Sequence, residues 1–382
     1  MVKKVALITI QYPPTIGGLQ EHIRGIAHLG ELLGYDITVI TAEPNPTMKM
    51  EGKTESNVIQ LPVLKWFKDG PIINPLTVYE TLKSINPDIV HVVYPFPIML
   101  DVACIFGYLN HKKVCCTYID DITVGFPVNK IYEKTCWKIC KCVIDSISAS
   151  SIEYSKSATG LKDWGKKIYN IPPPVFDTDF NLDLKDKYSA KKKLGLDKYD
   201  KVILFVGGLR KKLTYKRLDM LLKSWAQYNK VKQSNSVLVI IGGGELTNYY
   251  KDMAYELGLT PDNTVFKGYV SRETLIDTYL AGNMLVLPSE GTNEGFGITP
   301  VEAMLYGNAI IASDIPGIRG ALKRKKAYVS LTPPLNQDAI VNELLFWLSK
   351  SLNEYSLKNH QYVKDCYSNE IIGMEIKKMY DD

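Results

Sequence analysis

The sequence predicts an α/β protein made of two doubly wound domains, each with a parallel sheet covered by helices on both faces. Three observations lead to this fold class. Short β-branched runs alternate with helical stretches, as in βαβ units. This rhythm stops at "IPPPVFDTDF", residues 171–180, and then begins again. The chain also has 382 residues, more than one hydrophobic core usually organises.

The first half predicts strands separated by helices. We interpret "KKVALITI", residues 3–10, as a strand and not a signal peptide, because its apolar segment is short and no cleavage site follows. The helix "LQEHIRGIAHLGELLG" follows a Pro/Gly loop and ends at Gly34. Further strands are expected over residues 36–41, 88–93, 113–119 and 142–150.

Three consecutive prolines make residues 171–180 a stiff connector, since proline continues neither a helix nor a central strand. The second half then predicts strands over 201–208, 236–244, 263–270, 283–289 and 308–314, helices over 216–229 and 246–257, and a helical tail over 343–379. We therefore expect a first domain of residues 1–175, a second of residues 176–355, and a C-terminal helix of residues 356–382 that packs back on the first. Such sheets bind ligands at the carboxyl ends of their strands, which predicts an interdomain cleft.

Composition excludes several classes of function. A net charge of +5, from 46 basic and 41 acidic residues, is too balanced for a general nucleic-acid binder. No apolar run approaches the roughly 20 residues that span a bilayer. The seven cysteines lack the paired spacing of zinc sites. We expect reduced thiols, no obligatory metal, no nucleic-acid partner and a cytoplasmic location.

The stretch "EGFGITPVE" places Glu294 and Glu302 on either side of a glycine-rich loop and a helix start. Unpaired amides and the positive helix dipole form an anion site there, and glycine lets a phosphate approach the backbone. The loop residues expected at the phosphate are Gly295, Phe296, Gly297 and Ile298. Carboxylates suit sugar hydroxyls better than phosphates. The order acid, phosphate cradle, acid matches the parts of a nucleotide-sugar.

Glu302 also has a structural alternative. Thr299, Pro300 and Glu302 fit a capping box, with Thr299 as N-cap, and Gly307 supplies the helix stop. Glu294 has no such alternative, because it lies in a loop just after an expected strand.

The whole segment "LPSEGTNEGFGITPVEAMLYGNAIIASDIPGIRG" resembles the donor site of retaining glycosyltransferases of family 4, which have the two-domain GT-B fold. Further similar motifs occur in order along the chain: "YPPTIGGLQEHI", "SASSIEYSK", "KKIYNIPPPV", "VGGLRKKLTYKRLDMLL" and "FKGYVSRETLIDTYLAGNMLVLPS". The resemblance implies a UDP-, GDP- or ADP-linked sugar donor and no further cofactor. It also implies that Glu294 contacts the donor sugar, Glu302 the ribose diol, and Val270 the base region.

Arg210 and Lys216 follow the strand "KVILFVGG". By the same resemblance they hold the diphosphate, whose charge grows as it leaves, so cations there stabilise the transition state. A surface basic cluster is the alternative, and Lys211, Lys212 and Arg217 compete for the role.

Gly17 and Gly18 lie between the first strand and the first helix, which suggests a tight turn that places backbone against the donor. A plain βα turn is the alternative. "TIGGLQE" and "GGGELT" both fall short of a dinucleotide fingerprint.

On the acceptor side, "TYIDD" has Ile119 where many relatives carry a histidine. Asp121 is a candidate to orient or deprotonate the acceptor hydroxyl, or it only caps a turn. His91 is interpreted as a structural histidine. Retention also permits the leaving phosphate to take the acceptor proton.

The sequence therefore predicts a hexosyltransferase that acts on a hydroxyl of a glycan, a lipid-linked acceptor or a small molecule. A nucleotide-sugar epimerase, a phosphorylase of the same fold and a non-catalytic nucleotide-sugar-binding protein are the alternatives. In "NKIYEKTCWKICKCVI", lysines recur at helical spacing over residues 130–141. This stripe is either a solvated helix face or a site of peripheral contact with an anionic membrane.

Overall fold

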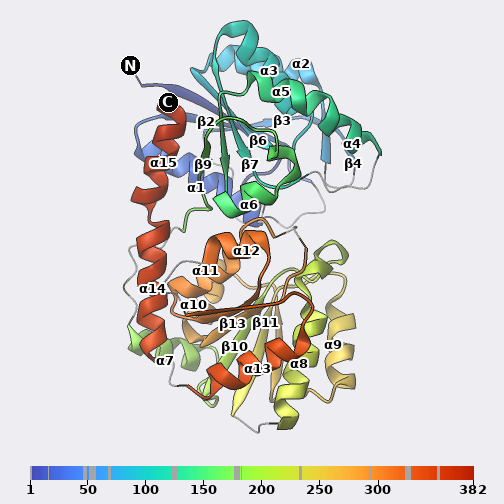
Figure 1. Cartoon of the computed structure of the whole chain (residues 1–382), viewed down its shortest axis with the longest axis vertical. Helices are drawn as coiled ribbons and strands as arrows, with labels where there is room; N and C mark the ends of the chain where they lie inside the picture. The colour runs from blue at the N-terminus through green and yellow to red at the C-terminus, as the bar shows by residue number, and fades with distance from the viewer. Residues whose placement is uncertain are drawn as a thin grey trace. The chain divides into compact units, whose positions relative to one another are not determined.

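The computed structural model describes residues 2–15, 17–45, 50, 57–67, 70–121, 127–175, 181, 183–231, 235–291, 294–322, 328–350 and 353–382. The side chains of residues 67, 127–130, 184–185 and 353–354 lie outside this description. The chain divides into two compact units (Figure 1). Unit 1 consists of Met1–Phe176 and Tyr367–Asp382, and unit 2 of Asp177–Cys366.

Unit 1 contains a seven-stranded sheet in the order β3-β2-β1-β6-β7-β8-β9, in which every neighbouring pair is parallel. The strands are β1 (Lys4–Ile8), β2 (Asp36–Ala42), β3 (Val58–Leu61), β6 (Ile89–Tyr94), β7 (Lys113–Tyr118), β8 (Ser146–Ala149) and β9 (Ile168–Asn170). β6 is buried along its whole length, as its continuous apolar run predicts. A separate antiparallel pair is formed by β4 (Val63–Phe67) and β5 (Gly70–Ile73).

Helices lie on both faces of this sheet (Figure 1). They are α1 (Gly18–Leu32), α2 (Pro75–Ile85), α3 (Met99–Asn110), α4 (Pro127–Lys134), α5 (Cys136–Val143), α6 (Ile152–Ser157) and the 3-10 turn η1 (Thr159–Leu161). The strand expected over 142–150 is shorter than predicted. Its first residues end α5, which buries Trp137 and Cys140 on one helical face.

Unit 2 repeats the architecture with a six-stranded parallel sheet in the order β12-β11-β10-β13-β14-β15. The strands are β10 (Lys201–Val206), β11 (Ser236–Ile241), β12 (Thr264–Gly268), β13 (Met284–Leu287), β14 (Ala309–Ser313) and β15 (Val329–Thr332). The helices are α7 (Leu184–Lys193), α8 (Leu218–Val231), α9 (Thr247–Glu256), α10 (Arg272–Ala281), α11 (Ile298–Leu305), α12 (Pro316–Leu322) and α13 (Gln337–Leu348), with the 3-10 helix η2 (Lys211–Lys216).

The tail is divided into separate helices where one helical stretch was expected. After α13 come α14 (Asn353–Tyr367) and α15 (Asn369–Asp381). Ser368 interrupts the two because its extended backbone and its hydroxyl, which accepts from the Ile371 amide, start a new helix. α14 bonds to unit 2, where Asn359 donates to the Asn308 carbonyl at 2.8 Å. α15 packs on α1, β8 and β9 of unit 1.

In the part of the chain that the structure describes, no helix combines the length and the apolar character that crossing a bilayer requires.

Candidate functional site

The predicted site residues of unit 2 gather at the carboxyl ends of β10 and β13. These two strands are neighbours, although β11 and β12 separate them along the chain. After β10 the chain adds β11 and β12 on one side of that strand. It then crosses back and adds β13, β14 and β15 on the other side. Ligands of open parallel sheets bind at such a switch point. Lys216 follows β10 and Glu294 follows β13.

The structure brings Lys216 and Glu294 together. Lys216 Nζ lies 2.7 Å from Glu294 Oε2, and the side chains are only 12% and 13% exposed. The Ser289 hydroxyl donates to the same oxygen at 3.3 Å. A Cβ added to Gly207 would lie 2.9 Å from Lys216 Cδ, so the lysine stem packs against a glycine backbone. The pair is thus held in place and largely shielded from water.

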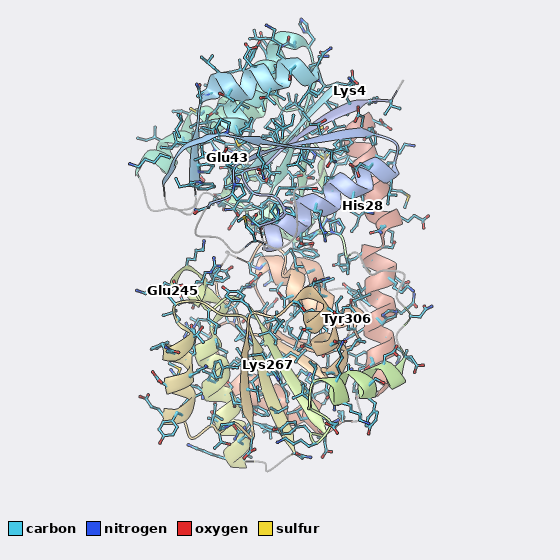
Figure 2. The ribbon with its side chains drawn as sticks, turned by 180° about the vertical axis from the view of Figure 1, so that it is seen from behind. Lys4, His28, Glu43, Glu245, Lys267 and Tyr306 are labelled. Atoms are coloured by element: carbon cyan, nitrogen blue, oxygen red, sulfur yellow. The ribbon has the colours of Figure 1, made fainter. Side chains whose placement is uncertain are left out.

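Glu302 forms a second ion pair, in which its own side chain is 16% exposed and that of Arg272 is 46% exposed. Its Oε1 lies 2.6 Å from Arg272 Nη1, and its Oε2 accepts from the Tyr279 hydroxyl at 3.0 Å. Burial, and then the negative charge of Glu302, raise the pKa of Tyr279 well above its ordinary value, so this phenol remains a hydrogen-bond donor. Tyr306, labelled in Figure 2, stacks on Tyr279 with ring centres 5.9 Å apart.

The capping box expected at Thr299 is not formed. α11 begins at Ile298, and its N-cap is Gly297 in the left-handed conformation, with φ 77° and no side-chain cap. Glycine adopts this φ without the strain that a Cβ imposes. Starting the helix before Thr299 moves Glu302 out of reach of the N-cap amide and turns it toward Arg272. The expected stop at Gly307 is present, with φ 78°.

The loop before α11 is pressed against α12. A Cβ added to Gly317 would lie 1.8 Å from the Glu294 carbonyl oxygen, so only glycine permits this approach. Phe296 is buried. Gly295, Phe296, Gly297 and Ile298 therefore run from the Glu294 side chain into the amino terminus of α11, as predicted.

Arg210 lies beside a different part of the site. Its Nη2 donates to the Tyr269 hydroxyl at 3.3 Å, and Val270, half-buried, follows Tyr269 directly after β12. Gly243 also touches the Tyr269 ring, from which an added Cβ would be 3.0 Å. Among the described contacts, none joins Arg210 to the pair of Lys216 and Glu294.

One of the competing basic residues, Arg217, has its cationic group occupied elsewhere. Arg217 makes bonds of 2.8–2.9 Å to Asp219 and to Glu290. The Lys211 amide donates to Glu245 Oε1 at 2.8 Å, and Glu245 is labelled in Figure 2. These contacts order the loop after β10 and favour Lys216 over Arg217 as the cation available to a ligand.

The glycines of "GGGELT" have a packing explanation. A Cβ on Gly242 would lie 2.0 Å from the Gly207 carbonyl oxygen, and one on Gly244 would lie 2.4 Å from that of Leu209. The ends of β10 and β11 thus approach backbone to backbone. This close contact explains the glycines of this segment, and no bound dinucleotide is needed to explain them.

In unit 1, Gly17 is the N-cap of α1 and Gly18 its first residue. A Cβ on Gly17 would lie 2.4 Å from Gln20 Oε1, so the amide side chain of Gln20 folds over the turn. Gln20 Nε2 donates to Gln11 Oε1 at 2.8 Å.

Asp121 is engaged by its own unit. Its carboxylate accepts from the Thr159 amide at 2.9 Å, from the Gly160 amide at 3.2 Å and from the Tyr118 hydroxyl. These bonds favour the structural alternative, in which the carboxylate holds the start of η1 rather than a turn next to it.

His91 is the structural histidine that we expected. It is fully buried, with Nδ1 2.8 Å from the Tyr380 hydroxyl and Nε2 2.7 Å from Thr117 Oγ1. Burial lowers its pKa to about 3. Within the described residues, no three His, Cys, Asp or Glu side chains are placed to hold a metal.

Sequence reasoning missed Arg272, Tyr279, Ser289 and Gly317. Ser289 and Gly317 had a signal, since Ser289 follows β13 closely and Gly317 follows the proline that begins α12. The partners of Glu302 come from α10, and no periodicity in the sequence pairs α10 with α11.

Comparisons with known proteins find glycosyltransferases among the relatives of this chain. Residues 186–364 match the family model "Glycosyl transferases group 1". An uncharacterized glycosyltransferase of Methanocaldococcus jannaschii is 26% identical over 99% of this chain and 97% of its own. The O-antigen chain mannosyltransferase C of Escherichia coli is 26% identical over 87% of this chain and 85% of its own.

Among solved structures, Anabaena HepE in complex with UDP-glucose is similar, with a TM-score of 0.72 and 14% identity. The match covers 98% of each chain. This likeness confirms the predicted fold class, α/β of the GT-B type with two doubly wound domains. The cleft expected between the domains stays a prediction.

Proposed function

We propose that this protein, whose residues 186–364 match the model of the group 1 family, is a glycosyltransferase that moves a hexose-type sugar from a nucleotide-sugar to a hydroxyl acceptor with retention of configuration. The observation that carries the proposal is the shielded contact of 2.7 Å between Lys216 and Glu294 at the switch point of the second sheet. A phosphate-binding cation beside a sugar-binding carboxylate is what a donor with a sugar–diphosphate bond requires.

In this proposal Lys216 serves both parts of the donor. An ammonium group has three N–H donors, and one is used by Glu294. Two remain for diphosphate oxygens, so Lys216 can bind the leaving group without releasing the carboxylate. Arg210 adds a second cation from the same loop. Both stabilise the charge that grows on the diphosphate as its bond to the sugar breaks.

The two carboxylates bind the two sugars of the donor. Glu294 accepts hydrogen bonds from hydroxyls of the transferred sugar, and Glu302 accepts from the ribose diol. Arg272 and Tyr279 orient Glu302 by holding its two oxygens. The backbone from Gly295 to Ile298 faces the diphosphate at the amino terminus of α11, where amides lack helical partners. Val270 lies at the base.

Retention follows from a reaction on one face of the sugar. The bond between the anomeric carbon and the diphosphate breaks, and the acceptor oxygen bonds to the same face of that carbon. The acceptor proton passes to the leaving phosphate oxygen, so charge and atoms balance without a protein base. An acceptor-side role for Asp121, and donor contacts by Gly17 and Gly18, stay predictions from the sequence.

The relatives suggest the range of substrates. The O-antigen mannosyltransferase is named for a glycan product, and HepE binds UDP-glucose. We therefore propose a UDP-, GDP- or ADP-linked sugar as donor and a glycan, a lipid-linked sugar or a small molecule as acceptor. Donor binding belongs to the domain of residues 176–355 and acceptor binding to residues 1–175, with residues 356–382 as the returning tail.

A thermal-shift panel of nucleoside diphosphates and their sugars tests the proposal. A ligand at 100 times its dissociation constant adds about 2.7 kcal/mol to the free energy of unfolding. We expect one nucleoside family to raise the melting temperature and the Lys216→Met variant to lose that shift. Failure of every nucleotide to shift the wild-type protein would contradict the proposal.

Product analysis then separates the enzyme classes. The donor that binds is incubated alone, with glycan acceptors, and with inorganic phosphate. Slow release of free sugar without acceptor supports a transferase. A changed sugar still attached to the nucleotide indicates an epimerase, and a sugar phosphate indicates a phosphorylase.

A further inference from the structure

We propose that the outer face of α3 and α5 in unit 1 is a docking surface for an anionic lipid bilayer. This surface, called the α3–α5 face below, goes beyond the sugar transfer and does not depend on it. α3 and α5 pack against each other along one side of the unit (Figure 1).

The α3–α5 face exposes aliphatic and aromatic side chains in a row. On α3, Ile105, Tyr108 and Leu109 are 53%, 70% and 60% exposed, at the spacing of one helical face. On α5, Ile139 is 67% exposed. Single exposed apolar residues are ordinary, but four on two packed helices form a patch that water disfavours.

Lysines border this apolar row. Lys138 precedes Ile139 on α5, Lys134 ends the preceding helix α4, and both are exposed. Thr135 separates the two helices, so the predicted stripe over residues 130–141 is not one continuous helical face. The Lys141 ammonium donates to the Gly160 carbonyl at 3.3 Å, so its charge stays near the end of α5. Lys130, the first lysine of the predicted stripe, lies outside the side chains that the structure describes. Apolar side chains between lysines are the pattern of an interfacial helix.

Two hollows flank the end of α5, and Cys142 lines both. One, of about 510 Å³, lies between the ends of α3 and α5 and contains His111, Lys112 and Lys113. The other, of about 560 Å³, is lined by Lys138, Lys141, Lys166 and Trp164. Each has room for a phosphate-bearing headgroup.

Carboxylates offset part of the positive charge of these hollows. In the first hollow, Asp145 and Asp382 balance Lys112 and Lys113. In the second, Asp163 stands against Lys138, Lys141 and Lys166, so this hollow keeps an excess of positive charge.

A bilayer fits both properties of the face. Anionic headgroups attract the lysines, each adding roughly a fivefold gain in binding near the surface, since 1 kcal/mol per basic residue corresponds to that factor. The isoleucine, leucine and tyrosine side chains enter the boundary between headgroups and acyl chains. A polynucleotide or an acidic protein would use the lysines and leave the aliphatic row in water.

Liposome flotation tests the proposal with the full chain. Vesicles of phosphatidylcholine alone are compared with vesicles containing one-third phosphatidylglycerol. We expect the wild-type protein to float with the anionic vesicles only. The variant Lys134→Glu, Lys138→Glu should bind them at least about tenfold more weakly. A matched control, Lys223→Glu with Lys230→Glu on α8, lowers the net charge equally and should bind like the wild type.

A second variant tests the apolar row. Leu109→Ser with Ile139→Ser keeps every charge and should weaken vesicle binding several-fold, with a melting temperature like that of the wild type. Equal flotation of the wild type, the variant Lys134→Glu, Lys138→Glu and the α8 control would overturn the proposal. So would tight binding to polyglutamate that is insensitive to the serine substitutions, which would indicate an acidic macromolecule instead.

Discussion

The two units share one sheet topology, but the side chains that follow their central strands differ in charge. In unit 2 the loops after β10 and β13 carry the ion pair of Lys216 with Glu294, and α10 and α11 add that of Arg272 with Glu302. In unit 1 the loop after β1 carries Gln11, a neutral amide. Its Oε1 accepts a hydrogen bond from Gln20 Nε2 of α1 at 2.8 Å. The loop after the first strand therefore occupies the same place in both sheets, and it is charged in unit 2 and neutral at these residues in unit 1.

The two units also differ in which side chains they bury. At the end of β6, Tyr94 stacks on Tyr118 with ring centres 4.6 Å apart and lies 4.3 Å from the ring of Trp137. His22 and His91 are buried in the same unit, and burial lowers their pKa values to about 4 and about 3. Unit 1 thus keeps its buried histidines neutral, whereas unit 2 keeps charges paired and partly accessible at the strand ends.

The largest expected effect comes from removing the charge of Glu294. The substitution Glu294→Gln keeps the shape but loses the ion pair with Lys216, and we expect kcat to fall roughly 100- to 1000-fold. Glu290→Gln is the matched control in the same loop, because Glu290 pairs with Arg217 instead. Steady-state kinetics of the two variants check this. Similar losses in both would remove the distinction between the carboxylates.

Next in size is the effect of adding a Cβ at Gly317. The new atom would lie 1.8 Å from the Glu294 carbonyl oxygen. Gly317→Ala must move the donor loop, and we expect a loss of about 3 kcal/mol in the stability of unit 2, with weaker donor binding. Gly373→Ala on α15 is the control, since its Cβ would meet Leu33 at an ordinary 3.8 Å. Urea unfolding and donor titration distinguish the variants.

The histidines predict acid sensitivity confined to unit 1. Between the folded pKa values and about 6.5, the unfolded chain takes up protons that the folded chain excludes. Stability is therefore present above pH 6.5 and lost as the pH falls, by about 1 kcal/mol for each histidine between pH 7 and 5.5.

Urea unfolding at each pH, with pulsed hydrogen exchange at one fixed labelling pH, measures this loss strand by strand. His91→Gln should reduce the pH dependence of β6. His28→Gln should not, because His28 is exposed on α1 (Figure 2). An equal loss in unit 2 would contradict the comparison.

The smallest expected effect concerns Asp121. Asp121→Asn places an amide group against backbone donors of Thr159 and Gly160, which should cost about 1 kcal/mol of stability. We expect kcat to stay within about threefold of the wild type, because these bonds favour a structural role. A large fall in kcat with unchanged stability would restore the acceptor-side role.

The sequence alone predicted the two parallel sheets and the segments that carry Lys216 and Glu294. Buried strands have continuous apolar runs, so β6 and β11 were evident from local pattern. Lys216 and Glu294 were each named through the resemblance to a known family, and their contact of 2.7 Å was not predicted.

Contacts that depend on tertiary geometry were not predictable. The residues around Thr299 fit the local pattern of a capping box. However, Gly297 adopts a left-handed conformation and α11 begins earlier, at Ile298. Glu302 then pairs with Arg272 instead of the N-cap amide. Gly317 was not predicted, because its role depends on a carbonyl 23 residues earlier in the chain. The division of the tail at Ser368 likewise depends on which unit each helix packs against.

The central claim is that the switch point of the second sheet binds a nucleotide-sugar between two carboxylates. The most direct test is a crystal structure of the protein with the nucleotide-sugar that gives the largest thermal shift. We predict the diphosphate within hydrogen-bond distance of Lys216 Nζ and the α11 amino terminus, with Glu294 on the transferred sugar and Glu302 on the ribose. A diphosphate bound elsewhere, or a Glu294 side chain turned to solvent in that complex, would contradict the claim.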